Sequence, residues 1–566
     1  MVRGKIIIYQ VLPRLFGNAH AACTPNGDIS VNGCGKLSDF TVRALQSNKR
    51  LGITHVWYTG VLEHATQTGY AEYGIRLDHP AIVKGKAGSP YAIKDYYDID
   101  PDLADDVPQR MKEFEHLVHR TKQQGLGVIM DFVPNHVARQ YYSDVQPERT
   151  KQLGADDDDA VAFNPNNNFY YLPNESFRGH FDLLAAAADP YTEHPARATG
   201  NDCFTASPHV TDWYDTVKLN YGVDYEHDRT PHFELLPDTW LKMRDILLFW
   251  ADKGIDGFRC DMVEMVPVDF WEWVIPQIKS FYPHLLFIGE VYNPSLYHAY
   301  VEQGRFDYLY DKVGLYDTLR SVTCGYASAT CIANAWQSLN GLEQRMVNFL
   351  ENHDEQRLAS DYYAGEGRRG IPALIAAACM NTNPLLIYFG QEFGEHGMDA
   401  EGFSGQDGRT SIFDYWSVST IRRWRDKGTF EGTLLDTHER ELQQQYVRIL
   451  NLCLHEKTIG NGQFFDLTYV NKQGWKFNEH KQYAFLRKYK HEVLLVVVNF
   501  DSIAVNVAVN LPSHAFDFLQ IPPIERIEAR DLLSDATETI SFLPYQATET
   551  HVDAYGGKLL KFTLSA

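Results

Sequence analysis

The sequence has too few basic residues for a nucleic-acid-binding protein. Its 566 residues include 52 Lys and Arg against 74 Asp and Glu, which gives a formal net charge of −22. Phosphate backbones repel an acidic chain, so we expect no nucleic acid partner. The sequence also lacks an apolar run long enough to span a bilayer, so we expect no membrane partner.

Other familiar signatures are missing as well. The eight cysteines do not form the close pairs that are typical of zinc sites, and there is no Gly-rich phosphate loop or dinucleotide fingerprint. The first apolar segment, KIIIYQV, is short and no small-residue cleavage site follows it, which predicts a strand rather than a signal peptide. We therefore expect a cytoplasmic protein, or a periplasmic or secreted one if a leader was removed.

Apolar strand-like segments alternating with helical ones are what the sequence does contain. Segments 107–125 and 237–254 have apolar positions at helical spacing, with Asp238 as the expected N-cap of the second helix. Eight strand–helix units favour a closed (β/α)8 TIM barrel over an open doubly wound sheet. The expected strands are 5–11, 54–59, 127–133, 254–260, 285–291, 306–311, 346–351 and 384–390.

Two regions interrupt this alternation. After the third strand the chain runs for about a hundred residues without helical period, as in FNPNNNFYYLPNES, which is too long for a loop and predicts a small inserted domain. Near the C-terminus, segments such as HEVLLVVVNF alternate with period two and predict an all-β sandwich domain. The expected division is 1–136 and 237–457 for the barrel, 137–236 for the insert and 458–566 for the β domain.

Carboxylates follow most of the expected barrel strands. The C-terminal ends of the strands meet at one rim of a TIM barrel, where the chemistry of such folds is found. Any single carboxylate here has a simpler interpretation as a helix cap, but their coincidence favours a shared pocket. Crowded carboxylates raise at least one pKa, and a paired nucleophile and acid are what glycoside hydrolysis requires. The residues are Asp131, Asp261, Glu290, Asp354 and Glu392, with Asp354 in the polar segment FLENHDEQR.

The motifs that carry these residues resemble those of the α-amylase superfamily of retaining glycoside hydrolases. The similar segments occur in order along the chain and at compatible spacing. They are SPYAIKDYYDIDP (89–101), DFVPNH (131–136), GFRCD (257–261), IGEVY (288–292), ENHD (351–354) and LIYFGQE (386–392). The resemblance covers essentially the whole chain and implies a retaining α-glycosidase that hydrolyses α-1,4-glucosidic bonds of starch-derived oligo- or polysaccharides.

The resemblance also implies a role for each site residue. Asp261 would be the nucleophile, Glu290 the general acid and base, and Asp354 the stabiliser of the transition state, with carboxyl groups roughly 5 Å apart. Independent physical arguments agree. Arg259, two residues before Asp261, should lower the pKa of the aspartate, and the apolar strand before Glu290 should raise the pKa of the glutamate. The implied sugar-binding residues are Tyr91, His136, Arg259 and His353.

Some features leave alternatives open. Asn135 matches a calcium-binding position of many relatives, although bonding to the loop backbone explains it equally well. Glu264 and Met265 stand where many α-amylases have Lys-His, and Gly88 stands where exo-acting α-glucosidases have Asp, so neither endo nor exo action is indicated. A glucanotransferase on the same machinery and a non-catalytic sugar-binding barrel are the competing interpretations.

Overall fold

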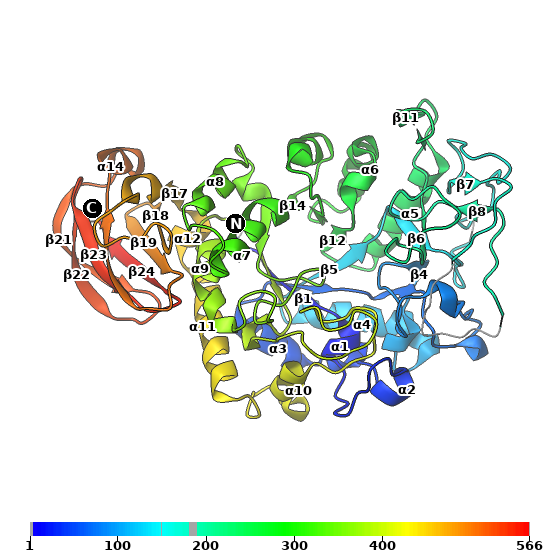
Figure 1. The fold of residues 1–566 in the computed structure, drawn as a ribbon, viewed down its shortest axis with the longest axis horizontal. Helices are drawn as coiled ribbons and strands as arrows, with labels where there is room; N and C mark the ends of the chain where they lie inside the picture. Colours follow the sequence, from blue (N-terminus) through cyan, green and yellow to red (C-terminus); the bar gives the residue numbers. More distant parts are fainter. Residues whose placement is uncertain (1–3, 149, 180–188, 565–566) are drawn as a thin grey trace.

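The eight expected barrel strands form a closed parallel barrel (Figure 1). The computed structural model describes residues 4–148, 150–179 and 189–564. Every neighbouring pair of barrel strands is parallel. The (β/α)8 prediction is therefore confirmed. The strands are β1 (Ile7–Val11), β2 (His55–Tyr58), β5 (Gly127–Phe132), β12 (Gly257–Cys260), β13 (Leu286–Gly289), β14 (Tyr308–Tyr310), β15 (Met346–Phe349) and β16 (Leu385–Tyr388).

One layer of the barrel interior explains how the strands position the site. Each strand contributes one side chain to this layer: Ile8, Trp57, Ile129, Arg259, Ile288, Tyr310, Val347 and Leu386. Branched and aromatic side chains fill the centre, as the continuous apolar runs predict. Arg259 is the single charged member of this layer and is only 1% exposed, so it requires carboxylate partners at the rim above it.

Helices cover the outside of the barrel (Figure 1). Asp238 is the first residue of its helix rather than the N-cap, which is Pro237, so the capping prediction was wrong. The Asp238 carboxylate instead pairs with Lys242, one turn further on, at 2.8 Å. Among the described helices, none is both long and apolar enough to cross a membrane. The longer helices are α3 (Val42–Leu51), α4 (Arg110–Gln123), α5 (Asp238–Asp252), α6 (Val268–Phe281), α9 (Ile371–Cys379) and α11 (Thr437–His455).

An antiparallel pair after β2, β3 (Leu62–His64) with β4 (Ile93–Ile99), was not among the expected strands. All seven residues of β4 are buried, although its sequence IKDYYDI is half polar. Lys94 in β4 pairs with Asp78 at 3.2 Å, so charge pairing within the fold permits this burial. No period-two pattern could show this, because the partners come from other segments.

The predicted insert after β5 contains short antiparallel pairs instead of helices in its described residues. Arg139 joins them, because its guanidinium pairs with Glu193 at 2.8 Å and donates to the carbonyl oxygens of Tyr214 and Thr216. The insert lies at the end of the molecule opposite the C-terminal domain (Figure 1). Its strands are β6 (His136–Ala138), β7 (Tyr171–Leu172), β8 (Ala196–Arg197), β9 (Thr216–Lys218), β10 (Val223–Asp224) and β11 (Thr230–Pro231).

The C-terminal region forms the expected β domain, but it is not all-β, because it also contains the short helices α13 (Thr468–Asn471) and α14 (Ser513–Leu519) (Figure 1). A six-stranded sheet, in the order β17-β18-β19-β24-β21-β22, and the pair β20-β23 are antiparallel and enclose a separate apolar core. The domain packs on the barrel through helix α9. Its strands are β17 (Gln463–Asp466), β18 (Gln482–Tyr489), β19 (Glu492–Asn499), β20 (Val505–Asn510), β21 (Ile524–Asp531), β22 (Thr537–Phe542), β23 (Ala547–Val552) and β24 (Gly556–Thr563).

Candidate active site

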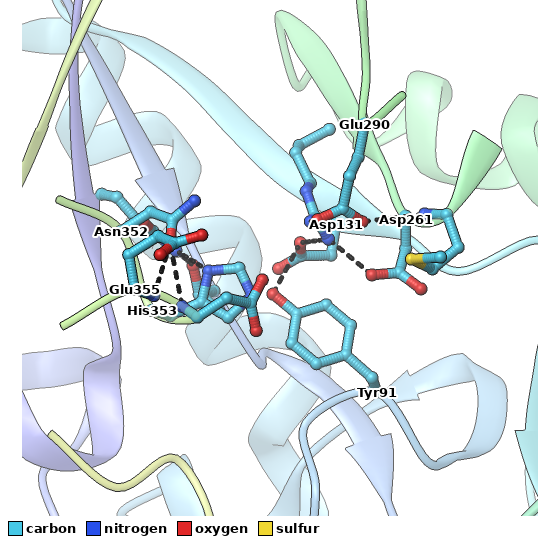
Figure 2. A network of polar contacts seen from close by, with 12 residues as sticks. Tyr91, Asp131, Asp261, Glu290, Asn352, His353 and Glu355 are labelled. Atoms are coloured by element: carbon cyan, nitrogen blue, oxygen red, sulfur yellow. Dashed lines mark hydrogen bonds and ion pairs between the residues drawn. The ribbon is translucent and has the colours of Figure 1, made fainter. Parts of the chain in front are cut away.

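Asp131, Asp261 and Glu290 lie close together at the rim (Figure 2), and the guanidinium of Arg259 contacts all three. One terminal nitrogen donates to Asp261 Oδ1 at 2.7 Å and lies 3.6 Å from Asp131. The other terminal nitrogen pairs with Glu290 Oε1, also at 2.7 Å. Arg259 and Asp261 lie on the same face of one strand because they are two residues apart. The structure places Arg259 beside Asp261, as their spacing in the sequence predicts, and its pairing with Glu290 is an addition that the sequence did not predict.

The backbone after Asp261 turns so that it also holds Glu290. Met262 adopts a left-handed conformation with φ of 42°, which side chains rarely favour. In this conformation its N–H donates to Glu290 Oε2 at 2.9 Å. The hydroxyl of Tyr292 donates to the other oxygen, Oε1, at 2.7 Å. Both oxygens of Glu290 are thus fixed, with Asp261 held on the same guanidinium beside it.

Burial dominates the protonation of this group of carboxylates. It raises the pKa of Glu290, as the apolar strand before it predicted. It also raises the pKa of Asp261, with Arg259 opposing the rise, so the expected net lowering was wrong. The pKa of Asp354 is raised as well, by its surroundings in the pocket and by the charge of Glu290, while its side chain stays 42% exposed. At least one carboxyl in the group therefore holds a proton near neutral pH, as crowding requires.

The segment FLENHDEQR divides into structural and site-facing residues. Glu351 is buried and accepts from Arg357 and from the N–H of Leu358, which closes the loop on itself. The side chain of Asn352 accepts from the N–H groups of Asp354 and Glu355 at 2.9 and 3.0 Å. These bonds hold the loop in shape, and His353 and Asp354 remain for the pocket.

His353 and Tyr91 form the wall opposite Asp261 and Glu290 (Figure 2). Their rings stack with centroids 5.0 Å apart, and Tyr91 OH lies 3.4 Å from Asp131 Oδ1. His353 Nε2 is 3.2 Å from Asp354 Oδ2, while Nδ1 is 2.8 Å from the side-chain nitrogen of Gln10. Burial and Arg259 hold the pKa of His353 well below its usual range, so the imidazole is neutral at neutral pH.

His136 lies at the edge of the same wall. It opens strand β6 and is only 3% exposed, with its ring 5.1 Å from the ring of Trp213. The backbone of Tyr91 lies near enough to act on the pKa of its ring, so His136 lies beside the stacking residue. Burial lowers the pKa of His136 to about 3, so it too is a neutral hydrogen-bonding group.

The surroundings of Asn135 do not fit the expected calcium ion. The ammonium group of Lys218 donates to Asn135 Oδ1 at 2.5 Å and pairs with Asp202 at 2.7 Å. The carbonyl oxygen of Met265 lies 3.4 Å from the same ammonium. Lys218 is 2% exposed, and its ammonium group occupies the place beside Asn135 Oδ1 where a calcium ion would bind. Its positive charge would repel that ion.

Replacing Lys218 with Met should lower the free energy of unfolding by about 3 kcal/mol, because it leaves Asp202 and Asn135 without their buried partner. The matched control is Lys151→Met, since the Lys151–Asp156 pair is exposed and should contribute little to stability. Urea unfolding of both variants measures the difference. Equal stability of the two variants would show that Lys218 does not have this role.

Several residues of the site could not be identified from their neighbours in the sequence. Gln10 contacts His353, and Trp57 donates its indole N–H to Asp131 at 3.1 Å. The sequence offered a signal for Gln10 alone, as a polar residue inside the apolar segment KIIIYQV. Tyr292 was visible within IGEVY but had no assigned role. Glu392, in contrast, is not part of the shared pocket: it is fully buried and accepts from the hydroxyl of Tyr9 at 2.6 Å.

Comparison with known proteins agrees with this geometry. A family model described as "Alpha amylase, catalytic domain" matches residues 10–425. The chain belongs to the α-amylase family. "Alpha-amylase 3" of Dictyoglomus thermophilum is 22% identical to this α-amylase family enzyme over 434 residues, which are 73% of this chain and 74% of that protein. "Cyclomaltodextrin glucanotransferase" of Bacillus sp. (strain 1-1) is 24% identical over 490 residues, which are 82% of this chain and 60% of that protein.

Solved structures of the family share the whole fold. The maltogenic α-amylase AmyB from Thermotoga neapolitana is 19% identical with a TM-score of 0.62, and 99% of each chain is covered. The α-amylase from Geobacillus thermoleovorans, solved with acarbose, is 18% identical with a TM-score of 0.64 over 99% of each chain. The similarity extends over the C-terminal β domain as well as the barrel of this family member.

Proposed function

We propose that this α-amylase family enzyme is a retaining α-glycosidase that hydrolyses α-1,4-glucosidic bonds in starch-derived oligo- or polysaccharides. The observation that carries the proposal is the shared guanidinium of Arg259. Its two terminal nitrogens lie 2.7 Å from Asp261 Oδ1 and 2.7 Å from Glu290 Oε1, so it holds the two carboxylates side by side. A retaining enzyme needs its two carboxyl groups about 5 Å apart, whereas an inverting enzyme needs room for a water between them. Because both Asp261 and Glu290 contact the same guanidinium, the two carboxyl groups are held close together, which supports the retaining arrangement.

The first chemical step breaks the glycosidic bond. A carboxylate oxygen of Asp261 attacks the anomeric carbon, and the protonated Glu290 gives its proton to the leaving glycosidic oxygen. The raised pKa of Glu290 keeps that proton available, and ionisation of Asp261 is supported by Arg259. The products are a β-glycosyl ester on Asp261 and the free shorter sugar.

The second step restores the enzyme. Glu290, now a carboxylate, removes a proton from a water molecule that attacks the anomeric carbon, and Asp261 leaves as a carboxylate. Tyr292 OH and the N–H of Met262, which bond the two oxygens of Glu290, fix its orientation for both proton transfers. The configuration of the released sugar is α, as in the substrate.

The opposite wall would grip the sugar during both steps. Tyr91, whose ring is held by its stacking on His353, would contribute its remaining ring surface to the pyranose. The neutral imidazoles of His136 and His353 can donate to or accept from sugar hydroxyls. Asp354, beside His353, would bond hydroxyls of the ring as positive charge develops on it.

A glucanotransferase is the second candidate, and the 24% identity to a cyclomaltodextrin glucanotransferase over 82% of this chain favours it. In this case a sugar hydroxyl replaces water in the second step, with the same residues. Glu264 stands where many family members have lysine. Its Oε2 accepts from the N–H groups of Tyr292 and Asn293, so it links the segment after β12 to the segment after β13. This bonding gives no preference between water and a sugar as the acceptor.

Product analysis after incubation with maltoheptaose and with starch separates the two candidates. We expect maltooligosaccharides shorter than the substrate and of α configuration, and none from Asp261→Asn. Products longer than maltoheptaose, also lost in the variant, would show transfer instead. An absence of products from both substrates would contradict action on α-1,4-linked glucans.

A further inference from the structure

A second group of carboxylates lies buried between β3 and β4, and it shares no residue with the catalytic rim. Glu63, Asp95 and Asp98 are 1%, 0% and 2% exposed, respectively. One oxygen from each carboxylate lies within 4.8 Å of the other two. Calcium–oxygen distances of 2.3–2.6 Å allow two ligand oxygens to be up to about 5 Å apart, so this spacing suits one shared calcium ion.

Glu63 is the residue that lacks a partner in this group. Neither of its side-chain oxygens has a hydrogen-bond donor within the described structure. The ammonium group of Lys94 is 3.8 Å from Glu63 Oε1, but it lies closer to Asp78, at 3.2 Å, and donates to the carbonyl of Arg76. Burial raises the pKa of Glu63 to about 9, because neighbouring positive charges do not offset the cost of burying its carboxylate.

The other members of the group are better satisfied but still acidic. Asp98 pairs with Arg110, and Asp95 accepts from the N–H groups of Tyr97 and Asp144. Asp144 itself has a buried oxygen, Oδ2, without a donor, and its charge acts on Glu63. The positive charges of Lys94 and Arg110 therefore face more carboxylates than they can neutralise.

We propose that Glu63, Asp95 and Asp98 form a binding site for a calcium ion. Carboxylate oxygens are the ligands that this hard cation prefers. The ion would join β3 to β4, and Asp95 would connect it to the start of the insert through the N–H of Asp144. It would give Glu63 the counter-charge that the protein lacks, and it is separate from Asn135, where Lys218 supplies the positive charge.

The test uses the full-length protein after removal of metal on a chelating resin. Calcium is titrated by calorimetry, and terbium binding is followed by luminescence sensitised through Tyr97, which precedes Asp98 in β4. We expect one equivalent of calcium to bind to the wild type and binding to be at least tenfold weaker in Glu63→Gln. The matched control is Asp159→Asn, in the exposed acidic run GADDDDAV, which should bind as the wild type does.

A third variant keeps the test decisive if Glu63→Gln fails to fold. Tyr97→Phe combined with Tyr141→Phe leaves the carboxylates in place and removes the two phenol groups that lie near Asp95. This double variant should keep the affinity for terbium while reducing the sensitised emission severalfold. Three results would overturn the proposal: no binding of calcium, magnesium or manganese up to about 10 mM, beyond the weakest calcium modules; unchanged binding in a folded Glu63→Gln; or unchanged terbium emission in the double variant.

Discussion

Replacement of Asp261 with Asn should lower kcat on maltoheptaose by on the order of 10⁴-fold or more, because the amide cannot form the glycosyl ester and losing a catalytic nucleophile has effects of this size. The Asn side chain can no longer pair with Arg259 as an anion, but it keeps the volume of the aspartate. The measurement is the rate of reducing-sugar release at saturating substrate, with the melting temperature recorded alongside.

Asp269→Asn is the control for this prediction. Asp269 is an exposed residue in the first turn of α6, eight positions along the chain, and its replacement should leave kcat within about twofold of the wild type. A folded Asp261→Asn with a tenth of the wild-type rate would show that another group is the nucleophile.

Replacement of Glu290 with Gln should lower kcat/KM on maltooligosaccharides by about 10³-fold, within the range that positioned general acids supply. An aryl α-glucoside with a good leaving group needs no proton at the first step, so its glycosylation rate should fall far less. Azide needs no general base at the second step, so adding it should restore turnover and yield an α-glycosyl azide. A variant impaired equally on both substrates and not rescued by azide would contradict the acid–base role.

The pH profile gives the same prediction a second readout. Burial raises the pKa of Glu290, so the group stays protonated above the ordinary carboxyl range. The kcat/KM of the wild type should therefore fall as the pH rises through this raised pKa, since the acid form is the one that donates. Glu290→Gln has no proton to lose at this position, and its profile should lack that basic limb.

The catalytic rim could be predicted because the signals that define it are local. Apolar runs predict the strands, acids lie at most of the strand ends, and the two-residue spacing of Arg259 and Asp261 places both on one face. The motifs around Asp261, Glu290 and Asp354 then fixed the family, which the match over residues 10–425 confirmed. The net pKa of Asp261 was predicted in the wrong direction because the extent of burial is not visible in GFRCD.

Other parts depend on partners that are distant in sequence. Asn135 meets Lys218 across 83 positions, so its suitability for calcium could not be judged from DFVPNH. Strand β4 was missed because Lys94 and its aspartates are buried through pairing with other segments. Glu392 follows a barrel strand, as the carboxylates of the shared pocket do. Its carboxylate is instead bound by the hydroxyl of Tyr9 in β1, which lies 383 positions earlier in the chain.

The central claim is that hydrolysis passes through a covalent glycosyl ester on Asp261. The most direct test is to incubate the wild type with 5-fluoro-α-D-glucosyl fluoride, whose second fluorine slows hydrolysis of the ester, and to analyse the protein by intact mass and peptide mapping. We predict a mass increase of one fluoroglucosyl unit, located on the peptide that contains Asp261 and absent from Asp261→Asn. An adduct on a different residue, or turnover of the reagent to a product of inverted configuration, would contradict the account.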